Sequence, residues 1–369
     1  MTTPQVEVLL IAVMVAACCS LPGVFLVLRG EAMATDAISH SILFGIVIAF
    51  LIVKDISSPF LLVGAALTGV LMVAIVEIIT NTKLVREDAS IGLVFPFLFS
   101  VGVILIAKKI GNVHIDTDAV LLGEIAFAPF DRLVIYGYDL GPKALYVLSG
   151  IFILNVLFIT IFYKELKLST FDPGLSTTLG FPSKVIHYCL MAIASLTAVG
   201  AFDAVGVVLV VALMIVPAAA SYLLVEKLYL MIVVSLIIAL VSSVSGFFIA
   251  TQMDISIAGT ISVTAGLCFV GIFFFAPRRG IIFLIAKKTR QKLDFAHLML
   301  LVHISNHEKL QERYNENNVR EIYKHLNWER IYTSTVIHMA INRGTVVDNK
   351  GVLSLSNKGK QHVIETIMK

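Results

Sequence analysis

Long apolar runs recur through the first 280 residues of this chain, and they restrict its fold more than any other feature. A helix that crosses a bilayer needs about 20 consecutive, mostly apolar residues, and nine runs approach that length. The two runs on either side of Asp203 are short and closely joined, so the sequence predicts eight or nine spans. The candidate spans are Val6–Leu28, Ala37–Val53, Pro59–Thr80, Ala89–Ala107, Lys143–Tyr163, Lys184–Val199, Val205–Leu224, Leu228–Ala250 and Ile255–Ala276.

The composition agrees with a chain that lies largely in lipid. The mean hydropathy is +0.93, 58% of the residues are hydrophobic and 14% are charged, which excludes an ordinary soluble protein. The four cysteines lie in apolar segments without metal-type spacing, which indicates inert thiols. A net charge of +3 is too small to argue for nucleic acid by itself. The sequence therefore predicts an all-α polytopic membrane protein over residues 1–280.

Basic residues between the runs predict the orientation, because cytoplasmic loops of membrane proteins are enriched in Lys and Arg. If the C-terminus is cytoplasmic and nine spans cross the membrane, the N-terminus is outside and most loop Lys and Arg residues are cytoplasmic. The basic residues that remain outside are Lys54, Lys108, Lys109, Arg132 and Lys143.

Asp36 and His40 form an acid–imidazole pair at the start of an uncharged apolar run. Positions four apart share one face of a helix, about 6 Å apart along its axis, and a carboxylate with an imidazole suits a divalent transition metal. Ionisable groups at membrane depth usually face a bundle interior or a transport pathway. The alternative is structural: Asp36 would cap the helix and His40 would lie on its first turn.

A second segment with ligand-type side chains lies in a predicted outer loop. There His114, Asp116 and Asp118 occupy alternate positions. They could collect metal at the mouth of a pathway, but an ordinary polar loop has the same composition, so both interpretations stay open.

The loop over residues 171–180 lies between two runs on the predicted cytoplasmic side. Asp172 can cap a short helix with Pro173 at its first position, and Gly180 can end it. Such a helix at the membrane surface would offer a docking element to a partner protein, and a solvated connector is the alternative. The residues assigned to docking are Phe171, Asp172, Pro173, Gly174, Leu175 and Gly180.

Five segments, in this order, resemble the permease subunits of bacterial ABC importers for manganese, zinc and iron. The segments are Gly23–Arg29, Asp36–His40, Asp88–Leu93, Phe171–Pro173 and Gly206–Ala220. The resemblance covers about residues 1–280 and implies that Asp36 and His40 line the translocation path and bind the passing metal. It also implies that the 171–180 loop is the coupling helix seated in a cytoplasmic ATPase. The chain departs from the family pattern with Gly174, where an acid is common, and with Asp203 in the tight turn.

Residues 281–369 differ in character from the rest of the chain. Charge and histidine content rise after about Lys287 and no further span follows, which predicts a cytoplasmic linker helix and a small domain. The pattern predicts helices at Asn318–Leu326 and Trp328–Asn342, a hairpin over Val346–Leu355 and a last helix at Gln361–Met368. This order resembles the winged helix-turn-helix domain of bacterial metal-dependent repressors. The predicted fold is thus an all-α polytopic membrane protein followed by a small α+β winged helix-turn-helix domain.

The second helix of this domain would enter the major groove if the domain bound DNA. Its basic groups are few and interleaved with acids, so a regulatory or packing role is also open. His303 and His307, four residues apart, could sense cytoplasmic metal or could be solvent-facing residues without a function. The candidate DNA-binding or regulatory residues are Arg330, Thr333, Ser334, Thr335, His338 and Lys350.

The leading functional hypothesis is the membrane permease subunit of an ATP-driven importer for manganese, zinc or iron. The chain has no G-x-x-x-x-G-K-[ST] motif, so a separate cytoplasmic ABC ATPase is expected to hydrolyse ATP and this subunit is not an enzyme. The resemblance further implies an extracytoplasmic metal-binding protein, a homodimer or a sister permease, no permanently bound cofactor, and the bacterial cytoplasmic (inner) membrane. The alternative function is a membrane-tethered, metal-responsive transcriptional regulator that binds nucleic acid.

Overall fold

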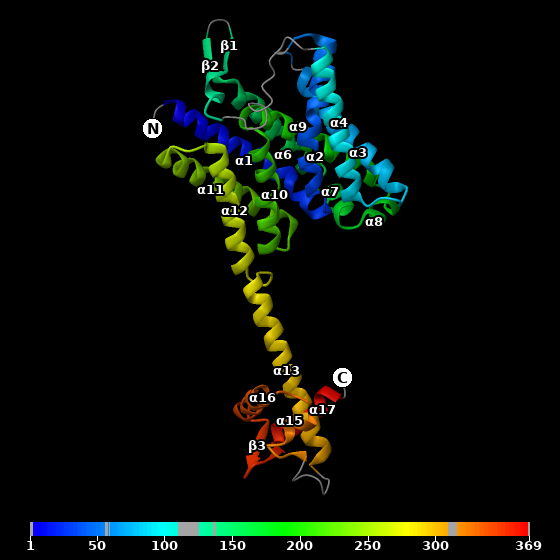
Figure 1. Cartoon of the computed structure of the whole chain (residues 1–369), viewed down its shortest axis with the longest axis vertical. Helices are drawn as coiled ribbons and strands as arrows, with labels where there is room; N and C mark the ends of the chain where they lie inside the picture. The colour runs from blue at the N-terminus through cyan, green and yellow to red at the C-terminus, as the bar shows by residue number, and fades with distance from the viewer. Residues whose placement is uncertain are drawn as a thin grey trace. The chain divides into compact units, whose positions relative to one another are not determined.

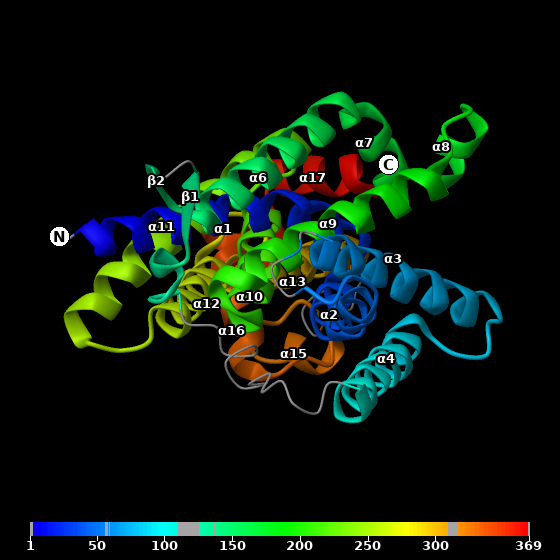
Figure 2. The same ribbon diagram turned by 90° about the horizontal axis from the view of Figure 1, so that it is seen from above.

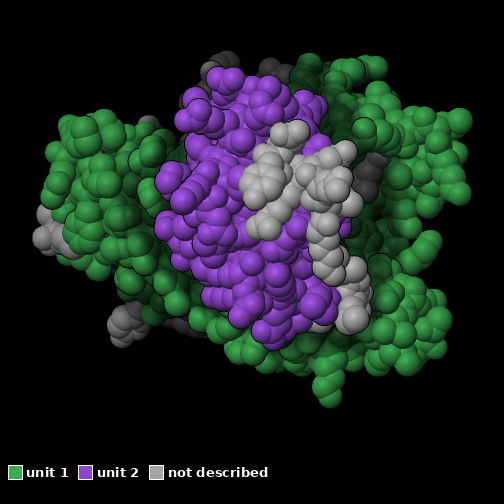
Figure 3. Space-filling model, turned by 90° about the horizontal axis from the view of Figure 1, so that it is seen from below, with its two compact units in different colours: residues 1–280 green, residues 281–369 purple. Residues whose placement is uncertain are grey.

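The computed structural model of the chain describes residues 3–55, 58, 60–109, 125–135, 138–308 and 316–367. The chain forms two compact units, Met1–Gly280 and Ile281–Lys369, which are coloured separately in Figure 3. Nine helices within the described ranges are long and apolar enough to cross a membrane, and all of them lie in the first unit. The predicted multi-pass helical fold is confirmed, and the higher of the two predicted span counts agrees with the structure.

The first unit consists of long helices with a few short elements between them (Figure 1). The long helices are α1 (Thr3–Arg29), α2 (Ala32–Val53), α3 (Phe60–Asn81), α4 (Glu87–Lys109), α6 (Lys143–Ile161), α9 (Ser183–Val205), α10 (Val207–Leu224), α11 (Leu228–Met253) and α12 (Ile257–Phe275). The short elements are a 3₁₀ helix, η1 (Ala128–Phe130), the strands β1 (Arg132–Ile135) and β2 (Tyr138–Pro142), and the helices α7 (Tyr163–Phe171) and α8 (Pro173–Thr178).

Helix α1 lies in the middle of this unit. It packs against α6, α9, α10 and α11, and nearly all its side chains from Ile11 to Leu26 are buried. Helices α2, α3 and α4 pack together on one side of it, and α11 and α12 pair on the other (Figure 2). At Gly23 the backbone of α1 comes so close to α10 that a β-carbon would overlap the Met214 carbonyl. Such close approach is what small residues permit between helices in lipid.

The connection between α9 and α10 differs from the prediction. Helix α9 continues to Val205, so Asp203 lies in its last turn as an exposed residue, and not in a tight turn. The turn is made at Gly206, whose φ of 80° is readily adopted only by glycine. In the sequence, a charged residue near the end of an apolar run resembles the turn, but Asp203 is helical and Gly206 makes the turn.

The second unit begins with the long helix α13 (Ile281–His307). The one-turn helix α15 (Ile322–His325), α16 (Arg330–Asn342), a hairpin of β3 (Val346–Asn349) and β4 (Val352–Leu355), and α17 (Asn357–Ile367) follow it. Side chains of α13, α16 and the hairpin, such as Leu301, Val336 and Leu353, form one buried core. The predicted hairpin and the predicted helix before it are confirmed, and Gly344, with a φ of 68°, follows that helix.

The first predicted helix of this unit is much shorter than expected. Asn318 forms a bridge with Val352 of β4, and the N–H of Val319 donates to the Gly351 carbonyl. These residues use their backbone groups for the hairpin, so they cannot use them for a helix. The last helix, in contrast, starts at Asn357, earlier than predicted.

Candidate functional site: a charged pair in a span and a capped docking helix

Asp36 and His40 lie together on α2. Their side chains are 3.6 Å apart, from His40 Nε2 to Asp36 Oδ1, and they are 32% (His40) and 45% (Asp36) exposed in the single chain. The neighbouring residues Ala37, Ile38 and Ser39 are buried on other faces of the helix. Both side chains are therefore only partly buried, and part of each is accessible in the single chain.

Asp36 is not the N-cap of its helix, because the helix starts before it. Helix α2 begins at Ala32 and its N-cap residue is Glu31, so Asp36 lies inside the helix and does not cap it. His40 contacts the ring of Phe95 on α4, with 5.8 Å between the ring centres. Within the described part of the chain, neither residue belongs to a cluster of three or more possible metal ligands.

A polar network that the sequence did not reveal lies where α1 ends. The Arg29 guanidinium donates to Ser169 Oγ at 2.8 Å and to Thr170 Oγ1 at 3.3 Å, both on α7. It also lies 3.2 Å from Nδ1 of His187 on α9, and the Glu31 carboxylate is 3.5 Å from the same nitrogen. Arg29 thus joins three helices whose partner residues are far apart in the sequence.

A cavity of about 290 Å³ adjoins this network. Arg29, Glu31 and His187 line it together with Glu77 of α3, which accepts a hydrogen bond from the Tyr188 hydroxyl and pairs with Lys184. Pro173, the first residue of α8, also lines the cavity. No spacing in the sequence predicts this site, and its one signal there is the charged pair Arg29 and Glu31 between two apolar runs.

Helix α8 has the cap that the sequence predicts. Asp172 Oδ1 accepts a hydrogen bond from the Leu175 N–H at 2.9 Å, Pro173 occupies the first position, and Gly180 follows the helix with a φ of 86°. At Gly174 an added β-carbon would meet no atom closer than 3.5 Å, so this position does not require glycine for lack of space. Large apolar side chains nevertheless stay exposed on and beside the helix. They are Phe171, Leu175, Leu179 and Phe181.

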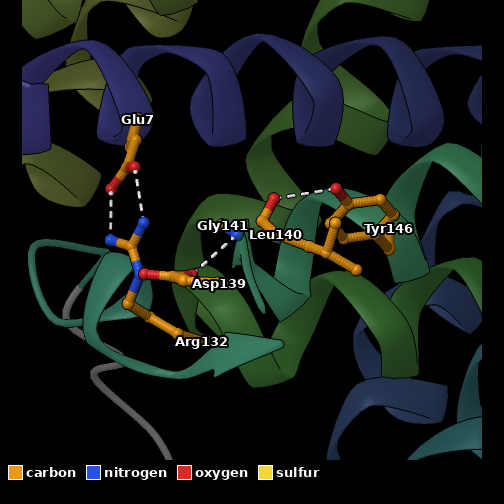
Figure 4. Close-up of polar contacts among 6 residues, drawn as sticks. All are labelled: Glu7, Arg132, Asp139, Leu140, Gly141 and Tyr146. Carbon is orange, nitrogen blue, oxygen red and sulfur yellow. Dashed lines mark hydrogen bonds and ion pairs between the residues drawn. The ribbon is translucent and has the colours of Figure 1, made fainter. Parts of the chain in front are cut away.

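The β1–β2 hairpin is fixed to the other end of α1 (Figure 4). Arg132 donates to both carboxylate oxygens of Glu7 at 3.4 Å and pairs with Asp139 at 2.5 Å. Asp139 in turn accepts from the Gly141 N–H at 2.9 Å. These hydrogen bonds, the one from Arg132 first, lower the pKa of Asp139. Because Glu7 and Arg29 lie near opposite ends of α1, the hairpin and the Arg29 network mark opposite ends of the bundle.

The other candidate of the membrane unit, formed by His114, Asp116 and Asp118, lies outside the described residues. It stays an expectation.

The candidate DNA-binding or regulatory residues of the second unit are only partly at its surface. Thr333 is buried and its hydroxyl donates to the Glu329 carbonyl at 3.0 Å, so it is not available to a base. Arg330 donates to the Tyr323 hydroxyl at 2.8 Å and lies over the Tyr323 ring. The candidates that are exposed are Arg330, Ser334, Thr335, His338 and Lys350.

His297 is buried in the second unit as a neutral side chain. The Thr345 hydroxyl donates to the Ala340 carbonyl at 2.9 Å, so it accepts from His297 Nε2 at 2.8 Å. Nδ1 of His297 then faces the Arg343 guanidinium at 3.5 Å, which itself pairs with Asp294. Burial, and secondly the positive charge of Arg343, lower the pKa of His297.

The fold and the charged groups in its spans define the class of the first unit: a multi-pass membrane protein with an ionisable pair in one span and an exposed, capped helix at one end. The sequence profile described as the ABC 3 transport family matches residues 4–276, and the chain belongs to this family. The family resemblance carried by the five sequence segments is thereby confirmed.

Two relatives and one solved structure illustrate the similarity. The zinc transport system membrane protein TroD of Treponema pallidum is 42% identical over 353 residues, 96% of each chain. The manganese transport system membrane protein MntD of Bacillus subtilis is 45% identical over 270 residues, 73% of this chain and 91% of that one. A chain of PsaBC from Streptococcus pneumoniae in complex with Fab has a TM-score of 0.64 and 29% identity, covering 77% of this chain and 96% of that chain. The TroD alignment is longer than the membrane unit, so it extends into the second unit as well.

Proposed function

We propose that this chain is the membrane permease subunit of an ATP-driven importer for a divalent transition metal, with zinc, manganese and iron as the candidate cargoes. Family membership supports the transport role, and the relatives TroD and MntD are named for zinc and for manganese. The observation that carries the choice of path is the Asp36–His40 pair, which places a partly exposed carboxylate and imidazole 3.6 Å apart in a span.

The path requires ligands from more than one chain. A bare dication cannot enter lipid without replacement of its hydration shell, and one carboxylate with one imidazole replaces only part of it. A second copy of the chain, or a sister permease, packed over the exposed part of this pair would double the ligand set and cover two ionisable side chains. Weak, incomplete ligation also suits transport, because an ion that enters must be able to leave.

The ATPase docks on α8 in this proposal. Its capped turn and the exposed Phe171, Leu175 and Leu179 form a short, fixed apolar surface, as a docking helix requires. The Arg29 network and its cavity, which Pro173 lines, then lie at the cytoplasmic end of the bundle. The N-terminus and the β1–β2 hairpin lie at the outer end, where a metal-binding protein would deliver the ion, and the C-terminus is cytoplasmic.

Metal uptake into vesicles that contain the permease, its ATPase and its binding protein tests the path. Asp36→Ala and His40→Ala should each abolish uptake while the protein remains inserted and folded. Asp203→Ala is the matched control, because it removes an exposed acid from another span. Uptake at the normal rate by His40→Ala would show that the pair is not the path.

The second unit is proposed to be a regulatory winged helix-turn-helix domain. The order of α15, α16, the β3–β4 hairpin and α17 supports this assignment. Removal of residues 281–369 should then preserve uptake and change its regulation. DNA binding is the second candidate function, favoured by the exposed His338 and Lys350; with so few basic groups it should be weak and steeply salt-dependent. Tight, sequence-specific gel shifts at physiological salt would favour the membrane-tethered regulator instead.

A further inference from the structure

Three ligand-type side chains converge in the second unit, apart from the proposed transport path. They are His303 and His307 on α13 and Glu316, which follows this helix in the chain. One possible ligand atom of each lies within 4.8 Å of the others, and all three side chains are partly buried. Among the described residues this is the one group of three or more possible metal ligands.

The hydrogen bonds of both imidazoles leave one nitrogen on each free for a metal. His307 Nδ1 lies 2.9 Å from the His303 carbonyl, and His303 Nε2 lies 3.2 Å from the Glu316 carbonyl. A carbonyl only accepts, so each of these nitrogens carries a proton and donates, and the other ring nitrogen of the neutral imidazole keeps its lone pair. Donation of the second N–H to a backbone carbonyl is the usual arrangement around a metal-binding histidine, because it fixes the tautomer and the ring.

The carboxylate is also held in place. His325 Nδ1 lies 3.0 Å from Glu316 Oε2, and its ring centre lies 6.2 Å from that of His303. His325 therefore orients Glu316 from the side of α15, and the second carboxylate oxygen stays available. Ligating carboxylates in metal sites are themselves hydrogen-bonded in this way.

The backbone directly after Glu316 is fixed to the core. The Asn317 carbonyl accepts from the Leu353 N–H at 2.9 Å, and the Asn317 side chain is fully buried. Glu316 is therefore held beside the β3–β4 hairpin while His303 and His307 belong to α13. An ion bound by all three would link the long helix to the hairpin.

We propose that His303, His307 and Glu316 bind a first-row divalent transition metal, with His325 as the positioning residue of the Glu316 carboxylate. Two imidazoles and a carboxylate suit zinc, cobalt, iron or manganese. In a tetrahedral site with bonds of about 2.1 Å the ligand atoms lie about 3.4 Å apart, so the separations of up to 4.8 Å in the cluster must shorten when an ion binds. Three protein ligands leave one position for water. If the transported ion is such a metal, the site would sense the concentration of imported ion. This sensing role rests on the proposed function, whereas the metal binding itself does not.

The test is a titration of the purified full-length chain with Co²⁺, followed by visible absorption, and then competition with Zn²⁺. The chain carries Asp36→Ala and His40→Ala, so that the proposed path cannot supply the signal and no uptake or ATPase activity is needed. One Co²⁺ per chain should bind with a tetrahedral or five-coordinate spectrum. His303→Ala and Glu316→Gln should each weaken binding at least about 100-fold, and His325→Phe about 10–100-fold.

Two further measurements keep the result interpretable. His338→Ala removes an exposed histidine outside the cluster and should bind Co²⁺ normally. The chain's single tryptophan, Trp328, lies in this unit and reports its unfolding; Glu316→Gln should unfold like the parent without metal but lose the stabilisation by Zn²⁺. Absence of Co²⁺ binding by the parent, or binding that survives both His303→Ala and Glu316→Gln, would overturn the proposal. Failure of this metal site would not contradict the proposed transport path at Asp36 and His40. Failure of that path would likewise not contradict this metal site.

Discussion

Arg29→Ala should destabilise the membrane unit and weaken its coupling to the ATPase. The guanidinium holds the end of α1 against Ser169 and Thr170 of α7, and α7 leads directly through Asp172 into the proposed docking helix. It also lies 3.2 Å from Nδ1 of His187, a mostly buried group that itself pairs with Glu31. Alanine removes all three contacts of Arg29.

The expected loss follows from the contacts. Hydrogen bonds to a charged group contribute about 1.5–3 kcal/mol each, and removal of one member of a buried ionic cluster costs about 3–5 kcal/mol. Because Arg29 is partly exposed, the lower end applies, and we expect a loss of about 3 kcal/mol. At about 1–2 °C for each kcal/mol in a unit of this size, the melting temperature should fall by about 3–6 °C.

Thermal unfolding of the purified complex and its metal-stimulated ATP hydrolysis measure the two effects. Arg29→Lys keeps the positive charge beside Glu31 but loses the planar fork of donors, so it should lie between the parent and Arg29→Ala. Lys164→Ala removes an exposed basic residue from the same helix, α7, and should change neither property. If Arg29→Ala melts and hydrolyses ATP as Lys164→Ala does, the network has no role in stability or coupling.

Three other variants test separate parts of the structure. Gly23→Ala should destabilise the bundle by about 1–3 kcal/mol, because the new methyl group overlaps the Met214 carbonyl, whereas Gly150→Ala, where a β-carbon meets open space, should unfold normally in the same thermal assay. Burial lowers the pKa of His297, so His297 takes up a proton more readily in the unfolded chain than in the folded one. The second unit should therefore be most stable above about pH 6.5, the ordinary pKa of histidine, and should lose stability as the pH falls below it. Tryptophan fluorescence during unfolding should show this slope, and His297→Gln should reduce it. Leu175→Glu should prevent co-purification with the ATPase, and retention of the ATPase by this variant would show that α8 is only a connector.

The spans could be predicted from the sequence because lipid imposes a length and a composition on each helix separately. The cap of α8 could also be predicted, since Asp172 and its backbone partner Leu175 are only three residues apart. The end of α9 could not be predicted in the same way, because a charge at Asp203 and a left-handed turn at Gly206 give similar signals in one sequence. Sequence patterns therefore predict an element correctly when the interacting residues are only a few positions apart in the chain.

The Arg29 network shows the opposite case. Its partners Ser169 and His187 lie 140 and 158 residues further along the chain, so no spacing rule connects them. Glu316 and His303 are closer, 13 residues apart, but they meet only because the segment after Glu316 pairs with the hairpin and does not form a helix. That pairing depends on tertiary contacts with the core, which a helix propensity does not contain.

The two proposed metal sites differ in a way that matches their proposed tasks. Asp36 and His40 contribute two ligand atoms from one helix, both side chains are partly exposed, and they belong to no group of three or more possible metal ligands among the described residues. The C-terminal site has three ligands from two parts of the chain, with each imidazole and the carboxylate fixed by a further hydrogen bond. A transport site must release its ion at every cycle, whereas a sensing site must hold the ion long enough to stabilise one conformation. Ion release from the C-terminal site should accordingly be slower than ion passage past Asp36 and His40, so metal should leave the second unit only when its free concentration falls.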